Sequence, residues 1–140
     1  EIGEKFGAPF AEDFPGFEGR RRKLKQAMAA IQLYEKDLFE YFVAGLLAVP
    51  GLTLYGIQDP ARFHQRTPTA AFTLAGRTPQ EVAEGLAEKG IYVWAGNFYA
   101  VAVTERLGLE KTGGVVRAGL AHYNTREEID YFIQCLKALA

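Results

Sequence analysis

An arginine in an otherwise apolar stretch is the residue of this chain best suited to binding chemistry. Arg117 lies within Val115–Leu120, a run of small and aliphatic residues that predicts a β-strand. Strand alternation places Val115, Arg117 and Gly119 on the same face. Gly119 leaves space beside the guanidinium for another molecule to approach. Because a guanidinium offers parallel N–H donors in a fixed fork, Arg117 is a candidate for binding a carboxylate.

Two structural interpretations of Arg117 also fit its position. On spacing alone, a strand arginine more often faces solvent or forms an internal ion pair than binds a ligand. The internal partner would be an acid such as Glu127 or Asp130. A ligand-binding arginine is expected to lack such a partner and to face a cavity.

Three further residues follow a predicted strand and are candidates for contact with the same ligand. The strand is predicted over 91–94, so that Trp94, Asn97 and Tyr99 come at or just after its end. The alternative for Asn97 is an ordinary turn asparagine beside aromatic residues of the core.

The composition argues against several classes of function. A net charge of −1 provides no basic field for nucleic acid. Two histidines and one cysteine, Cys135, make a poor zinc site and no disulfide framework. No apolar run approaches the roughly 20 residues that span a bilayer, and the N-terminus lacks the charge pattern of a signal peptide. We therefore expect no nucleic-acid or membrane partner and a cytoplasmic location.

The first third of the chain combines an irregular segment with a long helix. Six glycines or prolines interrupt residues 1–19 and predict irregular structure. From Arg20, apolar residues recur at helical spacing until Pro50, which predicts a helix of about 30 residues and about 45 Å. That length is consistent with a connecting helix whose end extends past the domain. The chain lacks an initiator methionine, which suggests processing or a piece of a longer protein.

Four phenylalanines in the irregular segment are unusual for a solvated linker. They either cover the core of this domain or dock against a neighbouring one. The four residues are Phe6, Phe10, Phe14 and Phe17.

The remaining pattern predicts an α+β fold. Strands are expected over 52–57, 69–74, 91–94 and 115–120, and a short helix over about 98–107. Thr78 and Thr125 each precede a glutamate by three residues, which predicts two capping boxes that begin helices. The order of elements indicates a three- or four-stranded, mainly antiparallel sheet with helices packed on one side, preceded by the long helix.

The segment Gly114–Asp130 resembles the closing motif of the cysteine desulfurase and class V aminotransferase family. In that family a strand arginine is followed by Tyr-Asn-Thr and an acidic helix start that ends in Ile-Asp. Four further segments resemble the family in the same order, and the similarity covers about residues 20–140. They are Ala27–Glu35, Val49–Gly51, Arg66–Thr69 and Gly90–Trp94.

The resemblance implies the C-terminal small domain of a fold-type-I enzyme that uses pyridoxal 5'-phosphate (PLP). It assigns Arg117 to the carboxylate of an amino acid substrate. The cofactor's lysine, phosphate ligands and aspartate belong to the large domain in this family, and none of the seven lysines here lies in the matching motif. We therefore expect PLP in the full-length parent enzyme, no catalytic residue and no PLP bound in this chain alone, and a homodimeric parent.

The resemblance also bears on the reaction. Some desulfurases carry the sulfur-accepting cysteine in a loop that corresponds to Trp94–Tyr99, and Tyr99 stands at the cysteine position. Cys135 is predicted to be a buried, inert thiol of the last helix. An aminotransferase, lyase or epimerase is therefore expected rather than a strong desulfurase. The alternative from a different class is a free-standing α+β module that binds a small carboxylate or a protein.

Overall fold

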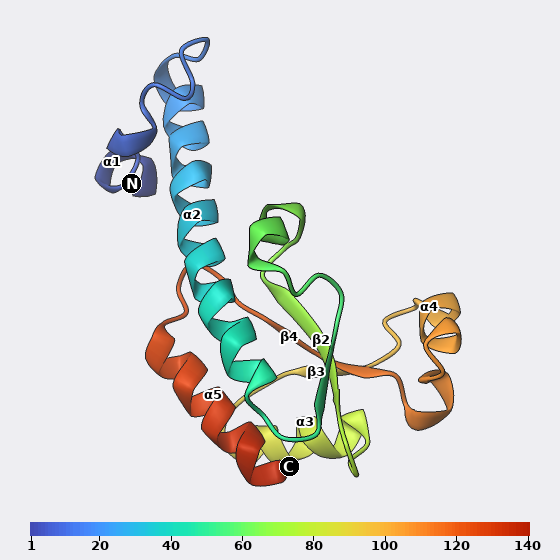
Figure 1. The fold of residues 1–140 in the computed structure, drawn as a ribbon. Coiled ribbons are helices and arrows are strands. Elements are labelled where there is room, and N and C mark those ends of the chain that lie inside the picture. Colours follow the sequence, from blue (N-terminus) through green and yellow to red (C-terminus); the bar gives the residue numbers. More distant parts are fainter.

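A four-stranded antiparallel sheet covered by helices on one face forms the body of the molecule. The computed structural model describes residues 1–140, and the strand order is β1-β2-β4-β3. Figure 1 shows the long helix and the C-terminal helix side by side against the sheet. The strands are β1 (Leu52–Tyr55), β2 (Thr69–Leu74), β3 (Trp94–Gly96) and β4 (Val115–Gly119). The helices are α1 (Ile2–Lys5), α2 (Gly19–Leu47), α3 (Pro79–Ala87), α4 (Val101–Arg106) and α5 (Arg126–Leu139). The predicted α+β fold is confirmed.

The two faces of the sheet differ in chemistry. Register pairs Phe72 of β2 with Leu54 on one side and Val116 on the other, so these side chains share the covered face. The opposite, open face pairs Arg117 with Ala71 on β2 and with Trp94 on β3. Strand alternation therefore separates a hydrophobic core from a face that is available to ligands.

Helix α2 contributes to the core only through its second half. Leu38, Phe39, Phe42, Val43 and Leu46 are buried. The rings of Phe42 and Phe132 of α5 meet edge to face at 5.3 Å. The first half projects past the sheet, as Figure 1 shows. The predicted long helix is confirmed, and no helix of the chain combines the length and apolarity needed to cross a membrane.

The N-terminal segment is more ordered than its glycines and prolines predict. It contains the single-turn helix α1 and a 3-10 turn, Ala8–Phe10, and both lie against α2. Gly3 explains the close approach, because a β-carbon there would collide with the backbone of Lys23. Lys23 also forms an ion pair with Glu4 at 2.7 Å.

The four N-terminal phenylalanines lie outside the hydrophobic core. None is buried, and Phe6 is 62% exposed. Phe14 and Phe17 meet each other edge to face at 6.3 Å. The interpretation that they cover the core of this domain is therefore wrong.

Local signals set most element boundaries. The capping boxes at Thr78 and Thr125 are both confirmed and begin α3 and α5. The strand predicted over 52–57 ends at Tyr55 and the one predicted over 115–120 ends at Gly119, and two other predictions are wrong by three residues. The strand predicted over 91–94 pairs only from Trp94 to Gly96, and the short helix begins at Val101 rather than near 98. The helix begins late because two residues before it adopt left-handed backbone angles.

Candidate functional site

Arg117 lies exposed on the open face of the sheet without an internal acidic partner. None of the ion pairs in the structure includes it. Asp130 instead accepts a hydrogen bond of 2.6 Å from Tyr41, and the neighbouring Arg126 pairs with Asp37 at 2.8 Å. The interpretation of Arg117 as an internal ion pair with Glu127 or Asp130 is therefore wrong.

A shallow depression of about 490 Å³ surrounds the Arg117 side chain. Its walls come from the segment before β2, from the start of β3 and from β4. Hydroxyl, guanidinium and aromatic groups meet there, a mixture that suits an anion attached to a small organic body. The lining residues are Thr67, Thr69, Tyr92, Trp94, Arg117 and Gly119.

Of the three other predicted site residues, only Trp94 lines this depression. Asn97 is engaged within its own loop: its amide nitrogen donates to Glu110 at 3.0 Å, and its amide oxygen accepts from the Tyr99 backbone at 3.1 Å. Tyr99 is fully exposed and does not line the depression. The structure therefore brings Arg117 and Trp94 together and places Asn97 in a supporting turn.

The loop between β3 and β4 is held by one polar network with a buried threonine at its centre. Thr104 is 4% exposed and donates its hydroxyl to Glu110, which also accepts from Asn97. The hydrogen bonds from Thr104 and Asn97 hold the pKa of Glu110 below its usual value. Its carboxylate is therefore charged at neutral pH and can accept both bonds.

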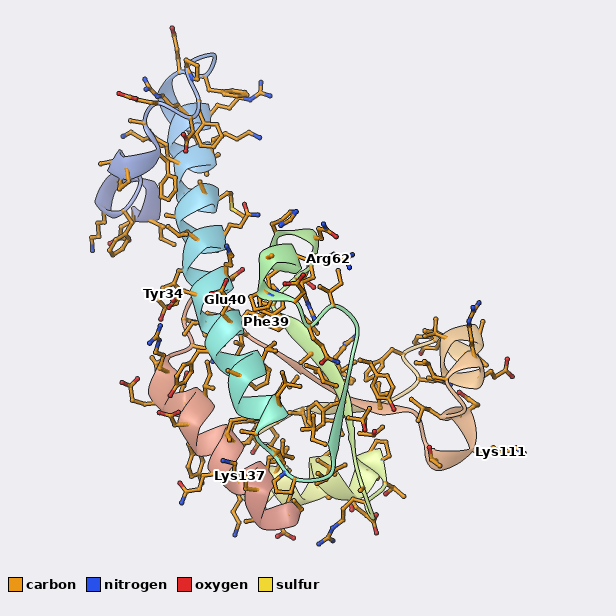
Figure 2. All side chains as sticks on the ribbon, viewed as in Figure 1. Tyr34, Phe39, Glu40, Arg62, Lys111 and Lys137 are labelled. Atoms are coloured by element: carbon orange, nitrogen blue, oxygen red, sulfur yellow. The ribbon has the colours of Figure 1, made fainter.

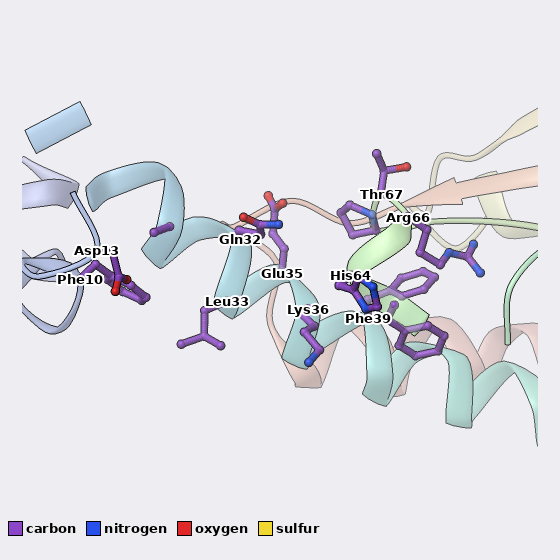
Figure 3. Close-up of a pocket in the computed structure, with 13 residues that line it drawn as sticks. Phe10, Asp13, Gln32, Leu33, Glu35, Lys36, Phe39, His64, Arg66 and Thr67 are labelled. Atoms are coloured by element: carbon purple, nitrogen blue, oxygen red, sulfur yellow. The ribbon is translucent and has the colours of Figure 1, made fainter. Parts of the chain in front are cut away.

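Arg66 stabilises the opposite wall of the depression. Its guanidinium donates to the carbonyl oxygens of Ile57 and, at 2.6 Å, of Thr69, and so joins the two ends of the loop between β1 and β2. It also lies 4.4 Å from the centre of the Phe39 ring. Figure 3 shows Arg66 beside Phe39, at the edge of a separate hollow of about 290 Å³ along α2. Burial lowers the pKa of Arg66, but the guanidinium remains charged.

We expect Arg66→Ala to lower the free energy of unfolding by about 1–3 kcal/mol, because two carbonyl groups lose their charged donor. Arg62→Ala is the matched control, since Arg62 is exposed and bonds only the Gln65 side chain. Its effect should stay within about 0.5 kcal/mol. Urea unfolding of the three proteins measures the difference. Equal stability of the two variants would contradict the role given to Arg66.

A sequence model of the family described as "Aminotransferase class-V" matches residues 17–132. The chain belongs to the aminotransferase class-V family. A probable cysteine desulfurase from Mycolicibacterium paratuberculosis is 37% identical over 123 residues, which are 88% of this chain and 17% of that protein. An aminotransferase-like protein from Gibberella zeae is 36% identical over 116 residues, 81% of this chain and 28% of that protein.

A solved structure shares the fold of this class-V chain. The apo cysteine desulfurase from Thermococcus onnurineus NA1 superimposes with a TM-score of 0.73 at 26% identity. The match covers 85% of this chain and 28% of that protein. The class-V chain therefore spans 17% to 28% of the length of these relatives.

Enzymes of the class-V family depend on PLP, but the residues around Arg117 do not form a site for it. PLP is held through a lysine Schiff base, and no lysine lines the depression. Lys23 and Lys36 pair with glutamates on or beside α2. Figure 2 shows Lys111 and Lys137 extending outward from the loop after α4 and from α5.

Sequence reasoning missed several residues around Arg117. Tyr92 could have been found, because it stands two residues before Trp94 and strand alternation gives the two a common face. Thr67 and Thr69 lie in a segment that resembles the family, but no local signal marks them as part of a site. Phe98, whose ring contacts Arg117, carries no signal, because its position depends on the left-handed backbone of the loop.

Proposed function

We propose that this chain is the C-terminal small domain of a PLP-dependent enzyme and binds the carboxylate of its amino acid substrate. The observation that carries the proposal is the position of Arg117. Its guanidinium is exposed in the depression on the face of the sheet that no helix covers, and no acidic residue of the chain pairs with it. A charged donor without an internal partner retains its capacity for an external anion.

The residues around Arg117 have distinct roles in this proposal. Arg117 binds the two carboxylate oxygens through its fork, and Thr67 and Thr69 offer hydroxyl hydrogens beside it. Trp94 and Tyr92 limit where the rest of the substrate lies. PLP supplies the electron sink for carbanion chemistry and is bound outside this chain, in the large domain. The contribution of this chain is to orient the amino acid relative to that cofactor.

The first half of α2 supports the proposal of a large-domain partner. Four large apolar side chains there are exposed, in addition to Phe6 of the N-terminal segment. Large apolar side chains exposed in this number are typical of an interface. The four residues are Leu24, Met28, Leu33 and Tyr34. We propose that they contact the large domain, with residues 1–19 as a docking segment and 20–140 as the small domain. We also propose that the parent is a cytoplasmic homodimer.

A free-standing module that binds a carboxylate or a protein is the competing proposal, and the same apolar surface fits a protein partner. The coding sequence distinguishes the two. An upstream region that encodes a cofactor lysine after a strand supports the PLP enzyme, whereas a start codon immediately before the codon of Glu1 supports the module.

Gly119→Val tests whether the depression holds the substrate. A β-carbon at this position would lie 3.4 Å from the Thr69 hydroxyl and meet nothing closer, so it does not collide, and valine is a residue that strands favour. The added methyl groups occupy the space beside Arg117. The test uses the complete protein, in which this chain is joined to the cofactor-binding domain. We expect Gly119→Val to lower its affinity for L-alanine by about tenfold or more and to leave its melting temperature unchanged.

Thr53→Val is the matched control for this test. Thr53 lies on the same open face, but on β1, where it pairs with Thr73 rather than with β4. Isothermal titration of the two variants with L-alanine makes the comparison. If Gly119→Val binds as well as Thr53→Val, the depression is not the site.

A further inference from the structure

The contact that places the Arg117 side chain is with an aromatic ring. The carbon at the centre of its guanidinium lies 4.2 Å from the centroid of the Phe98 ring, the shortest of the six cation–π contacts in the chain. An arginine side chain has four rotatable bonds and loses much freedom when it binds a ligand. A ring against one face of the guanidinium reduces that freedom in advance and leaves the in-plane N–H groups available.

The backbone under Phe98 adopts an unfavourable conformation. Phe98 and Tyr99 have φ angles of 54° and 61°, and they are the only non-glycine residues with positive φ. A β-carbon makes this left-handed region unfavourable, and bulky residues rarely occupy it. Such a conformation persists only where the surroundings hold it, and it is concentrated at ligand and catalytic sites.

The surroundings of Phe98 supply that restraint. The Asn97 side chain bonds the Tyr99 backbone on one side and Glu110 on the other, and Glu110 is fixed in turn by the buried Thr104. At the base of the loop Gly114 lies against the carbonyl of Gly96, where a β-carbon would collide. The network therefore fixes the loop from which the Phe98 ring reaches Arg117.

We propose that Phe98 is the positioning residue for Arg117. Its ring holds the guanidinium in the orientation in which the N–H fork meets a carboxylate, and the bonds from Asn97 to Glu110 and Tyr99 fix the ring. This inference rests on the proposed function of Arg117. It adds that the loop corresponding to the cysteine-bearing loop of some desulfurases here serves carboxylate recognition through an aromatic residue.

The geometric part is tested on the 140-residue chain by nuclear magnetic resonance. We expect the Nε–H proton of Arg117 to be shifted upfield by the ring current and to show nuclear Overhauser effects to the Phe98 ring. Phe98→Leu should remove both signals, and Phe98→Tyr should keep them, at similar melting temperatures. Arg117 signals that are identical in wild type and Phe98→Leu would overturn the proposal.

The binding part is tested on the complete protein with L-alanine as the probe. Phe98→Leu is expected to weaken binding by about three- to tenfold, and Phe98→Tyr to restore it, because the loss is that of one cation–π contact. In an Arg117→Ala background Phe98→Leu should have no further effect. Tyr41→Leu is the matched control, since the Tyr41 ring contacts Arg126 at 5.0 Å between α2 and α5, away from the open face; it should bind as wild type.

The outcomes separate this inference from the proposed function. If Arg117→Ala leaves L-alanine binding unchanged, the proposed function fails and the positioning role fails with it. If Arg117→Ala weakens binding and Phe98→Leu does not, only the positioning role is overturned. Asn97→Ala tests the same role in a second way, because it removes the bonds that hold the loop and leaves the Phe98 ring in place. We expect it to weaken L-alanine binding to a similar extent. Binding equal to that of wild type would contradict the role of the Asn97 bonds.

Discussion

Arg117→Ala in the complete protein is expected to weaken L-alanine binding by about 2–4 kcal/mol, roughly 30- to 700-fold. The reason is the loss of a charged, two-pronged hydrogen bond to the substrate carboxylate. The same substitution should leave the melting temperature of the 140-residue chain nearly unchanged, because Arg117 is exposed and has no acidic partner within the chain. Titration calorimetry and thermal unfolding provide the two measurements.

Arg117→Lys is the control for charge alone. An ammonium keeps the charge but not the planar fork, so we expect only part of the affinity to return. A large loss of stability with unchanged affinity would show that Arg117 is a structural residue and would remove the basis of the proposed function.

Incubation of the complete protein with L-cysteine is expected to leave no persulfide on this chain and to release sulfide only at the level of unrelated PLP enzymes. The phenol of Tyr99 cannot take up sulfane sulfur as a thiolate does. Cys135 lies within α5 at the edge of the core, on the covered side of the sheet, and it is partly buried, so the prediction of a buried thiol is wrong. Mass spectrometry of the chain detects or excludes the mass of one added sulfur atom.

Tyr99→Cys provides the matched variant for the sulfur test. The side chain at position 99 is fully exposed, so the introduced thiol is free to react. We expect a persulfide on that thiol if the loop corresponds to the cysteine-bearing loop. A persulfide on Cys135 in the unaltered protein, together with rapid sulfide release, would contradict the prediction.

Much of the fold could be predicted because its signals are local. The alternation of Ala70, Phe72 and Leu74 defines β2 and its buried face, and the structure has the strand over the predicted residues. Each capping box needs only a threonine and a glutamate three residues apart, and both begin helices. Arg117 was recognisable as a candidate because a charged residue within a small, apolar strand is unusual.

The loop after β3 could not be predicted because its conformation depends on distant partners. Asn97 and Glu110 are 13 residues apart, and their bond holds Phe98 in a backbone region that its own sequence disfavours. The role of Gly3 could not be predicted for a related reason. A glycine can either interrupt a helix or allow two segments to pack closely, and the second role is evident only once the position of α2 is known. Long-range contacts therefore determine the parts of the site that local patterns miss.

Recognition of a carboxylate by Arg117 is best tested by removing the carboxylate from the ligand as well as the arginine from the protein. The measurement is the affinity of the wild-type complete protein and of Arg117→Ala for L-alanine and for ethylamine, which lacks the carboxylate. We predict that wild type prefers L-alanine, that Arg117→Ala loses this preference, and that ethylamine binds both proteins equally. If Arg117→Ala lowers the affinity for L-alanine and for ethylamine equally, Arg117 does not recognise the carboxylate.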